Sequence, residues 1–235
     1  MHERHNEPLF FNLMLADHVQ DRSIKQQRGT TMRQVYEKIW VKARPFYEKG
    51  RPMDIDHIGW MMEEADRLCE EECLEDRILL PLVILHDVGY ARVPKDNPFN
   101  MDIRRAHMEE GAKIAKEILD AVGYEKEKTS IITYFVSMHD NWALDDIEVY
   151  QRNKLLWIFT DLDFIWMATP KGFDAVKEIQ GKTGEGMIEY LESTEKPAKP
   201  IGFASEATEK IFNRHLAERK MALKLFGEQR STKEK

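Results

Sequence analysis

The sequence has few cysteines, a deficit of positive charge and no long apolar run. Its two cysteines, Cys69 and Cys73, exclude a disulfide scaffold and a four-thiolate zinc site. The 42 Asp and Glu residues outnumber the 35 Lys and Arg residues and give a net charge of −7, which argues against stable nucleic-acid binding. No segment reaches the roughly 18 apolar residues that cross a bilayer, and the charged start of the chain is unlike a signal peptide. We therefore expect a cytoplasmic protein without a membrane partner.

The remaining composition indicates a folded domain. Hydrophobic residues make up 42% of the 235 residues and aromatic residues 10%, which excludes an intrinsically disordered chain. The negative net charge describes the whole surface rather than one cleft, so it is compatible with an anionic small-molecule substrate.

Apolar residues recur at helical spacing along the chain, and no segment alternates with the period of a strand. The pattern predicts an all-α fold. Asp102 is expected to cap one helix, while Gly89 and Gly123 are expected to end two others. We expect helices at 31–48, 55–72, 77–88, 103–122, 125–139 and 151–168, a short helix after Pro170 and a long one at 204–227.

These helices are expected to form one domain. An arm at 1–30 precedes the main domain at 31–192, and a helical appendage with a tail at 193–235 belongs to the same domain. The Lys-, Pro- and Glu-rich loop at 193–200 is the only candidate linker. The long helix at 204–227 is amphipathic, so it either packs back on the domain or forms a homodimer, and we favour the first.

Four of the eight histidines lie on the expected inward faces of four different helices. Their spacing from apolar residues of the same helix places each imidazole on the buried side. A hydrogen-bonded core histidine is the usual explanation for any one of them, but four together would each need a separate partner. The four residues are His57, His86, His107 and His139.

Carboxylates accompany these histidines. Asp87 directly follows His86, and Asp161 lies between two isoleucines on an apolar helix. Asp163 is flanked by apolar residues in the same way, so spacing does not decide which of the two is the ligand. A buried carboxylate is costly unless it is paired or bound to a metal. A shared metal centre satisfies all these groups at once, and the donor set suits Mn, Fe, Zn or Ni.

The order of these residues resembles the H…HD…D signature of the HD-domain superfamily of metal-dependent phosphohydrolases. His57 is the first histidine, and His86–Asp87 is the HD pair. Asp161, within FTDLDFIW, takes the place of the final aspartate. LLPLVILHDVG is similar to the family's apolar helix ending in HD-x-G, and RRAHMEEGAKIAKEIL to the H-x-x-x-G-A helix of members with two metals. The resemblance covers about residues 55–168 and implies an HD-domain helical bundle with additional C-terminal helices.

The resemblance also implies a dinuclear site that holds two divalent ions of Fe, Mn, Ni, Zn or Mg. Asp87 would bridge the two ions. His57, His86 and Asp161 would complete the first ion's ligands, and His107 and His139 would hold the second ion.

The implied activity is hydrolysis of a phosphomonoester or phosphodiester, with a phosphorylated, nucleotide-like small molecule as the substrate. His86, Asp87 and Asp140 are the expected catalytic residues. Asp140 directly follows His139 and would be a further ligand, an acceptor behind the ligands, or an exposed residue at a helix end. The arginines near the ligands either pair with the substrate phosphate or lie on the surface; they are Arg92, Arg104 and Arg105.

The chain departs from the HD-GYP branch of this superfamily. Tyr90 stands where that branch has a lysine, and no GYP segment follows His139, so cyclic-dinucleotide hydrolysis is not expected. The same ligand order also occurs in HD-fold mixed-valent di-iron oxygenases, with which Tyr90 is compatible. We favour the hydrolase over the oxygenase. We favour both over a non-catalytic HD-fold module, because degenerate members generally lose metal ligands.

Overall fold

The computed structural model of the protein describes residues 33–95, 97–193, 199 and 201–233, with side chains up to residue 225. It divides into two units, Met1–Lys38 and Ile39–Lys235. Residues 33–38 of the first unit are described, and they are helical. The predicted arm at 1–30 lies outside the described residues, as do 194–198 and 200 of the predicted linker and 234–235 of the predicted tail.

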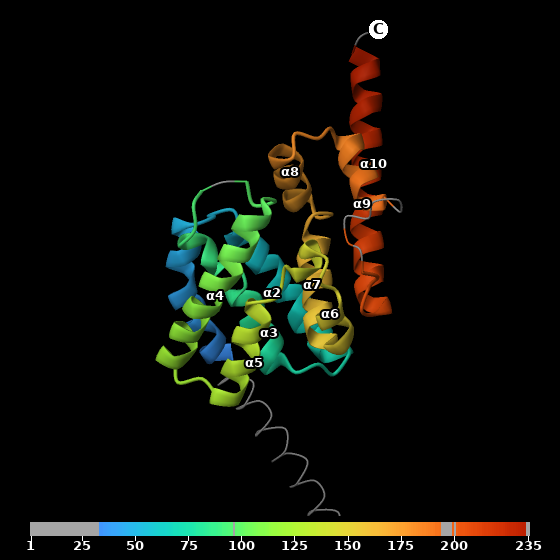
Figure 1. Ribbon diagram of the computed structural model, residues 1–235. Coiled ribbons are helices and arrows are strands. Elements are labelled where there is room, and N and C mark those ends of the chain that lie inside the picture. The colour runs from blue at the N-terminus through green and yellow to red at the C-terminus, as the bar shows by residue number, and fades with distance from the viewer. Residues whose placement is uncertain (1–32, 96, 194–198, 200, 234–235) are drawn as a thin grey trace, which may run out of the picture. The chain divides into compact units, whose positions relative to one another are not determined.

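Within the described residues of the second unit, every element is a helix, which confirms the predicted all-α fold (Figure 1). Residues 39–49 continue the helix that begins at 33. After it come α2 (Asp54–Glu71), α3 (Asp76–Leu85), η1 (Val88–Ala91), α4 (Met101–Ala121), α5 (Lys126–Val136), η2 (Asn141–Leu144), α6 (Glu148–Arg152), α7 (Lys154–Trp166), α8 (Pro170–Ile179), α9 (Gly184–Glu192) and α10 (Glu206–Lys233).

Helix α3 lies at the centre of the core. Every residue from Ile78 to Leu85 is buried, because α2, α5 and α7 all pack against this one helix. Pro81 lies inside α3 and has no N–H to donate to the carbonyl of Arg77. The hydroxyl of Tyr124 donates to that carbonyl instead, at 2.7 Å, so the proline leaves no unpaired acceptor.

The glycine after the HD pair has a different role from the one predicted. α3 ends at Leu85, four residues before Gly89, and Gly89 lies inside the short helix η1. A Cβ atom at Gly89 would lie 1.9 Å from the carbonyl oxygen of His107 on α4. The prediction that Gly89 ends the helix is therefore wrong. This glycine allows η1 and α4 to approach closely, as the contact between the two elements requires.

Other helix boundaries differ from the prediction in position. Asn100 caps α4 by accepting a hydrogen bond from the backbone N–H of Asp102, so Asp102 lies inside the helix. Gly123 follows the end of α4 with φ 69°, as expected. α5 ends at Val136, which leaves His139 in the following turn. The predicted helix at 151–168 is two helices, α6 and α7, and two helices rather than one follow Pro170.

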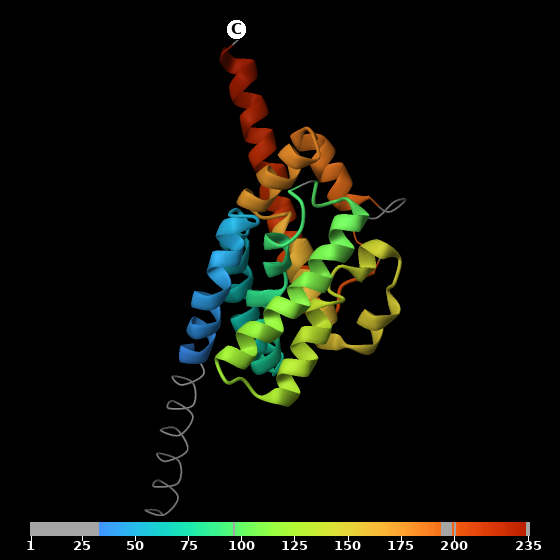
Figure 2. The same ribbon diagram turned by 60° about the vertical axis from the view of Figure 1, so that its left-hand side comes forward.

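The C-terminal helices contact the core through α7. α10 packs against α7 and α9, and α8 packs against α9. Figure 1 shows α10 running alongside α7, and Figure 2 shows α4 and α5 side by side. Among the described residues, the search for a helix able to cross a membrane found none.

The reactivity of the two cysteine thiols can show which face of α2 is buried. Cys69 is buried on that face, and burial together with nearby carboxylates raises the pKa of its thiol to about 12, whereas Cys73 is exposed. We expect a thiol-specific reagent at pH 8 to modify Cys73 at once and Cys69 only after unfolding. Cys73→Ser should remove the fast reaction. Equal rates for both thiols would contradict this packing of α2.

Candidate metal centre

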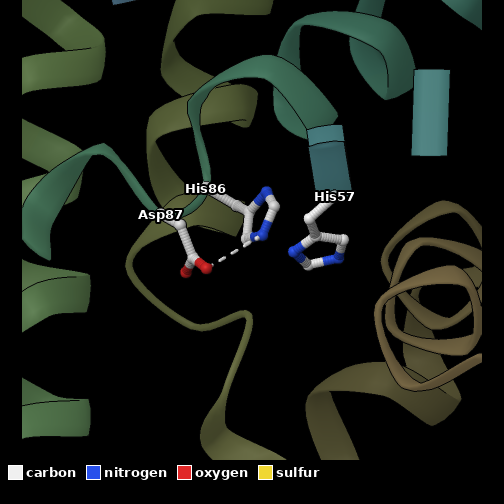
Figure 3. A group of neighbouring side chains, drawn as sticks. All are labelled: His57, His86 and Asp87. Carbon is white, nitrogen blue, oxygen red and sulfur yellow. Dashed lines mark ion pairs between the residues drawn. The ribbon is translucent and has the colours of Figure 1, made fainter. Parts of the chain in front are cut away.

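Four histidines and one aspartate from separate parts of the chain meet in the core. His57 lies on α2, His86 and Asp87 follow α3, His107 lies on α4 and His139 follows α5. They form two groups, His57–His86–Asp87 and Asp87–His107–His139, and within each group the potential ligand atoms lie within 4.8 Å of one another. Figure 3 shows the first group, with both imidazoles and the carboxylate converging. All five side chains are buried, and Asp87 belongs to both groups.

The backbone orients three of the imidazoles. Nδ1 of His86 lies 2.9 Å from the carbonyl of Val83, and Nδ1 of His139 lies 2.8 Å from the carbonyl of Val136. Nδ1 of His107 lies 3.3 Å from the carbonyl of Ile103. A carbonyl oxygen only accepts, so each ring donates from Nδ1. Each neutral ring therefore presents the lone pair of Nε2 to the cluster, as metal-binding histidines do.

In the neutral rings, which donate from Nδ1, the Nε2 atoms carry no proton. Nε2 of His107 and Nε2 of His139 lie 3.1 Å apart, and each is within 3.4 Å of the same Asp87 oxygen. Nε2 of His86 is buried and has no hydrogen-bond partner. Buried acceptors that face one another repel unless a cation or a proton lies between them. This donor set of imidazole nitrogens and carboxylate oxygens therefore fits divalent ions.

The electrostatics of the cluster agree with this requirement for positive charge. Burial alone would raise the pKa of Asp87, but the surrounding His86, His107 and His139 hold it well below its ordinary value. Burial lowers the pKa of His86, yet the carboxylates of Asp87 and Asp163 raise it to about 9. The carboxylates thus attract a proton onto His86 in the absence of any other cation.

The structure corrects the choice between the two aspartates of α7. Oδ1 of Asp163 lies 3.2 Å from Nε2 of His57 and 3.9 Å from Nε2 of His86. Asp161 does not face the cluster. The two residues lie about 200° apart around the helix, so only one of them can point toward α2 and α3. Asp163 is therefore the aspartate of α7 that faces the histidines, and the expectation that Asp161 faces them is wrong.

Asp161 has a separate set of partners near the start of α10. Its carboxylate pairs with the buried Lys199, and it accepts hydrogen bonds from the backbone N–H of Ala204 at 2.7 Å and the hydroxyl of Thr208 at 2.6 Å. Lys199 also donates to the carbonyl of Gly202. These contacts engage both oxygens of Asp161, and none of them involves a histidine of the cluster.

The other predicted site residues divide between the cluster and the surface. Arg104 is 10% exposed and pairs with Asp140 at 2.8 Å, and Asp140 lies 3.8 Å from Nε2 of His107. Arg92 pairs with Glu110 and Glu117, and Arg105 pairs with Asp102, so neither reaches the cluster. Of the two alternatives for these arginines, the structure therefore favours the surface position over a contact with the substrate phosphate. Arg104 alone lies three residues before His107, on the same face of α4.

A cavity of about 90 Å³ opens directly onto the cluster. Sequence reasoning missed Arg51, which lines it. Arg51 lies over the ring of Tyr90 and pairs with Asp54 at 3.1 Å. The sequence feature that could have identified Arg51 is its position in the short connection directly before the helix that carries His57. The polar residues lining the cavity are Arg51, His57, Asp87, Tyr90, Arg104, Asp140 and Asp163.

Comparisons with protein-family models, curated proteins and solved structures found no match. Inferences about function therefore rest on the residues of this site.

Substitution of each aspartate of α7 by asparagine separates their roles. Asp163→Asn should lower the metal content of the folded protein, because it removes a charged oxygen beside His57. Asp161→Asn should leave Lys199 as an uncompensated buried charge and reduce the free energy of unfolding by about 3–5 kcal/mol. Elemental analysis and urea unfolding measure the two effects. Metal loss from folded Asp161→Asn, with full metal content in Asp163→Asn, would reverse the assignment.

Proposed function

We propose that this protein is a metal-dependent phosphohydrolase that resembles the HD-domain superfamily and cleaves a phosphomonoester or phosphodiester of a small, nucleotide-like molecule. The observation that carries the proposal is the shared carboxylate of Asp87, which lies among four buried imidazoles and faces a cavity lined by two arginines. Phosphoryl transfer needs groups that position the ester and balance its negative charge, and this site has both kinds.

Six residues would hold two divalent ions. Asp87 would be shared, with His57, His86 and Asp163 around one ion and His107 and His139 around the other. Bound there, the ions would supply Lewis acidity, which activates water and balances charge on the phosphoryl oxygens.

The local charge supports an anionic substrate despite the net charge of −7. The two arginines that line the cavity each have an acidic partner. Arg104 is paired with Asp140, which also lines the cavity, and Arg51 is paired with Asp54. Asp87 and Asp163 remain to balance two divalent ions, which leaves an excess of about two positive charges at the site. A phosphate group is therefore attracted to this cavity even though the surface as a whole is acidic.

The chain's own residues have distinct roles in this proposal. The guanidinium groups of Arg51 and Arg104 orient the phosphoryl oxygens, since both line the cavity beside Asp87 or Asp140. Tyr90 stacks on the His107 ring, with centroids 4.2 Å apart, and also lines the cavity. A phenol keeps its proton at neutral pH, so Tyr90 can donate that proton to the leaving oxygen. Asp140, the other predicted donor, is paired with Arg104 instead.

Metal loading tests the reaction class. The manganese-loaded protein should release phosphate from nucleotide or aryl esters, and His86→Ala and Asp87→Ala should abolish that release without loss of helicity. The alternative is an HD-fold di-iron oxygenase, which would consume oxygen when loaded with iron and release no phosphate with any divalent ion. Those two results together would contradict the proposed hydrolase and support the oxygenase.

Removal of one hydroxyl tests the role of Tyr90. Tyr90→Phe should lower kcat by about 10²- to 10⁴-fold with little change in KM or metal content, because the ring still stacks on His107 while the proton donor is lost. Tyr134→Phe is the matched control, since Tyr134 is exposed and lies outside the cavity lining. An unchanged kcat in Tyr90→Phe would assign proton donation to another group.

A further inference from the structure

The cavity that opens onto the cluster is lined by apolar side chains on one part and by the polar side chains of the candidate site on the other. Val176 and Ile179 of α8 and Tyr190 of α9 line it together with Met53 and Met167. We call these five residues the apolar wall. None of them binds the cluster, and α8 and α9 lie beyond the segment 55–168 that carries the HD-domain resemblance. Three of the five wall residues therefore belong to C-terminal helices outside that segment, whereas Met53 and Met167 lie in the connections before α2 and after α7.

The fold places the wall firmly. Thr169 caps α8 directly after α7, and its side chain accepts from the backbone N–H of Gly172 at 3.2 Å. Thr183 caps α9 in the same way through Gly186, at 3.0 Å. The two helices pack on each other, and α9 also packs on α10. Val176, Ile179 and Tyr190 thus lie on capped helices that other elements support.

Aromatic rings extend the apolar lining toward the polar groups. Trp166 stacks on the His57 ring with centroids 5.1 Å apart and an interplanar angle of 19°. Phe99 and Trp142 lie beside the Arg104 guanidinium, which is 5.3 Å and 5.6 Å from their ring centroids. All three rings line the cavity. A flat group attached to a phosphate bound at the arginines would therefore lie among aromatic and aliphatic side chains.

A phosphate alone would leave this lining in contact with water. An apolar group attached to the phosphate removes that surface from water and gains binding free energy in proportion to the area covered. We infer that the apolar wall is a specificity site for an aryl or similarly flat apolar group of the substrate. The site therefore selects aromatic phosphate esters over small polar ones. This inference rests on the proposed function for the position of the phosphate.

The test compares the binding of two non-hydrolysable phosphonates to the manganese-loaded protein by calorimetry. 1-Naphthylmethylphosphonate should bind at least about tenfold more tightly than methylphosphonate, because only the first covers the apolar wall. Ile179→Glu should abolish most of this difference and leave methylphosphonate binding within about twofold. Gln180→Glu, which adds the same charge at the neighbouring position outside the cavity lining, should keep the difference.

Binding needs no turnover, so this test and the test of the reaction class fail separately. Equal affinity for the two phosphonates, no binding of either, or an equal loss in Ile179→Glu and Gln180→Glu would overturn the specificity site. Phosphate release from any ester would still support the hydrolase in each of those cases. A preference for the naphthyl compound that Ile179→Glu removes would support the site even if no ester is cleaved.

Discussion

The buried carboxylate of Asp87 is the group on which the rest of the site depends. It is 8% exposed and belongs to both histidine groups, so the chain must deliver imidazoles to it from four separate segments. Its position follows from the close approach of η1 to α4, where Gly89 lies against the backbone of His107. A larger residue at 89 would force the two elements apart and move Asp87 away from His107. The close packing of η1 against α4 therefore also fixes the position of Asp87 relative to His107.

Helical periodicity was sufficient to predict that the four histidines face the core, whereas Asp87 was identified by its position directly after His86. His57, His107 and His139 lie on or beside helices with one apolar face, and for such helices the face identifies the direction of the side chain. The prediction held for His139 even though α5 ends at Val136 and the histidine lies in a turn. Its backbone still follows the helix closely enough for Nδ1 to donate to the Val136 carbonyl. Whether these residues bind metal remains a prediction.

Periodicity failed where a helix is buried on every side. α7 buries Asp161 at 0% exposure and has apolar neighbours around its whole circumference, so no stripe marks the face toward the histidines. The partner of Asp161, Lys199, lies 38 residues farther along the chain, and nothing local reveals that pairing. Arg51 was missed for a related reason. It lies in a connection between helices, where side-chain direction has no period to follow.

The two aspartates of α7 explain how one apolar helix can carry two buried carboxylates. Asp161 is neutralised by Lys199 and by donors near the start of α10, whereas Asp163 faces His57 and His86. A second contact links the same regions, because His215 of α10 meets Trp60, which meets Trp166, which stacks on His57. α10 and the segment before it thus contact both α7 and α2 through residues that are not part of the cluster. The ion pair of Asp161 and the ring contacts both limit rotation of α7, and such rotation would move Asp163 relative to the imidazoles.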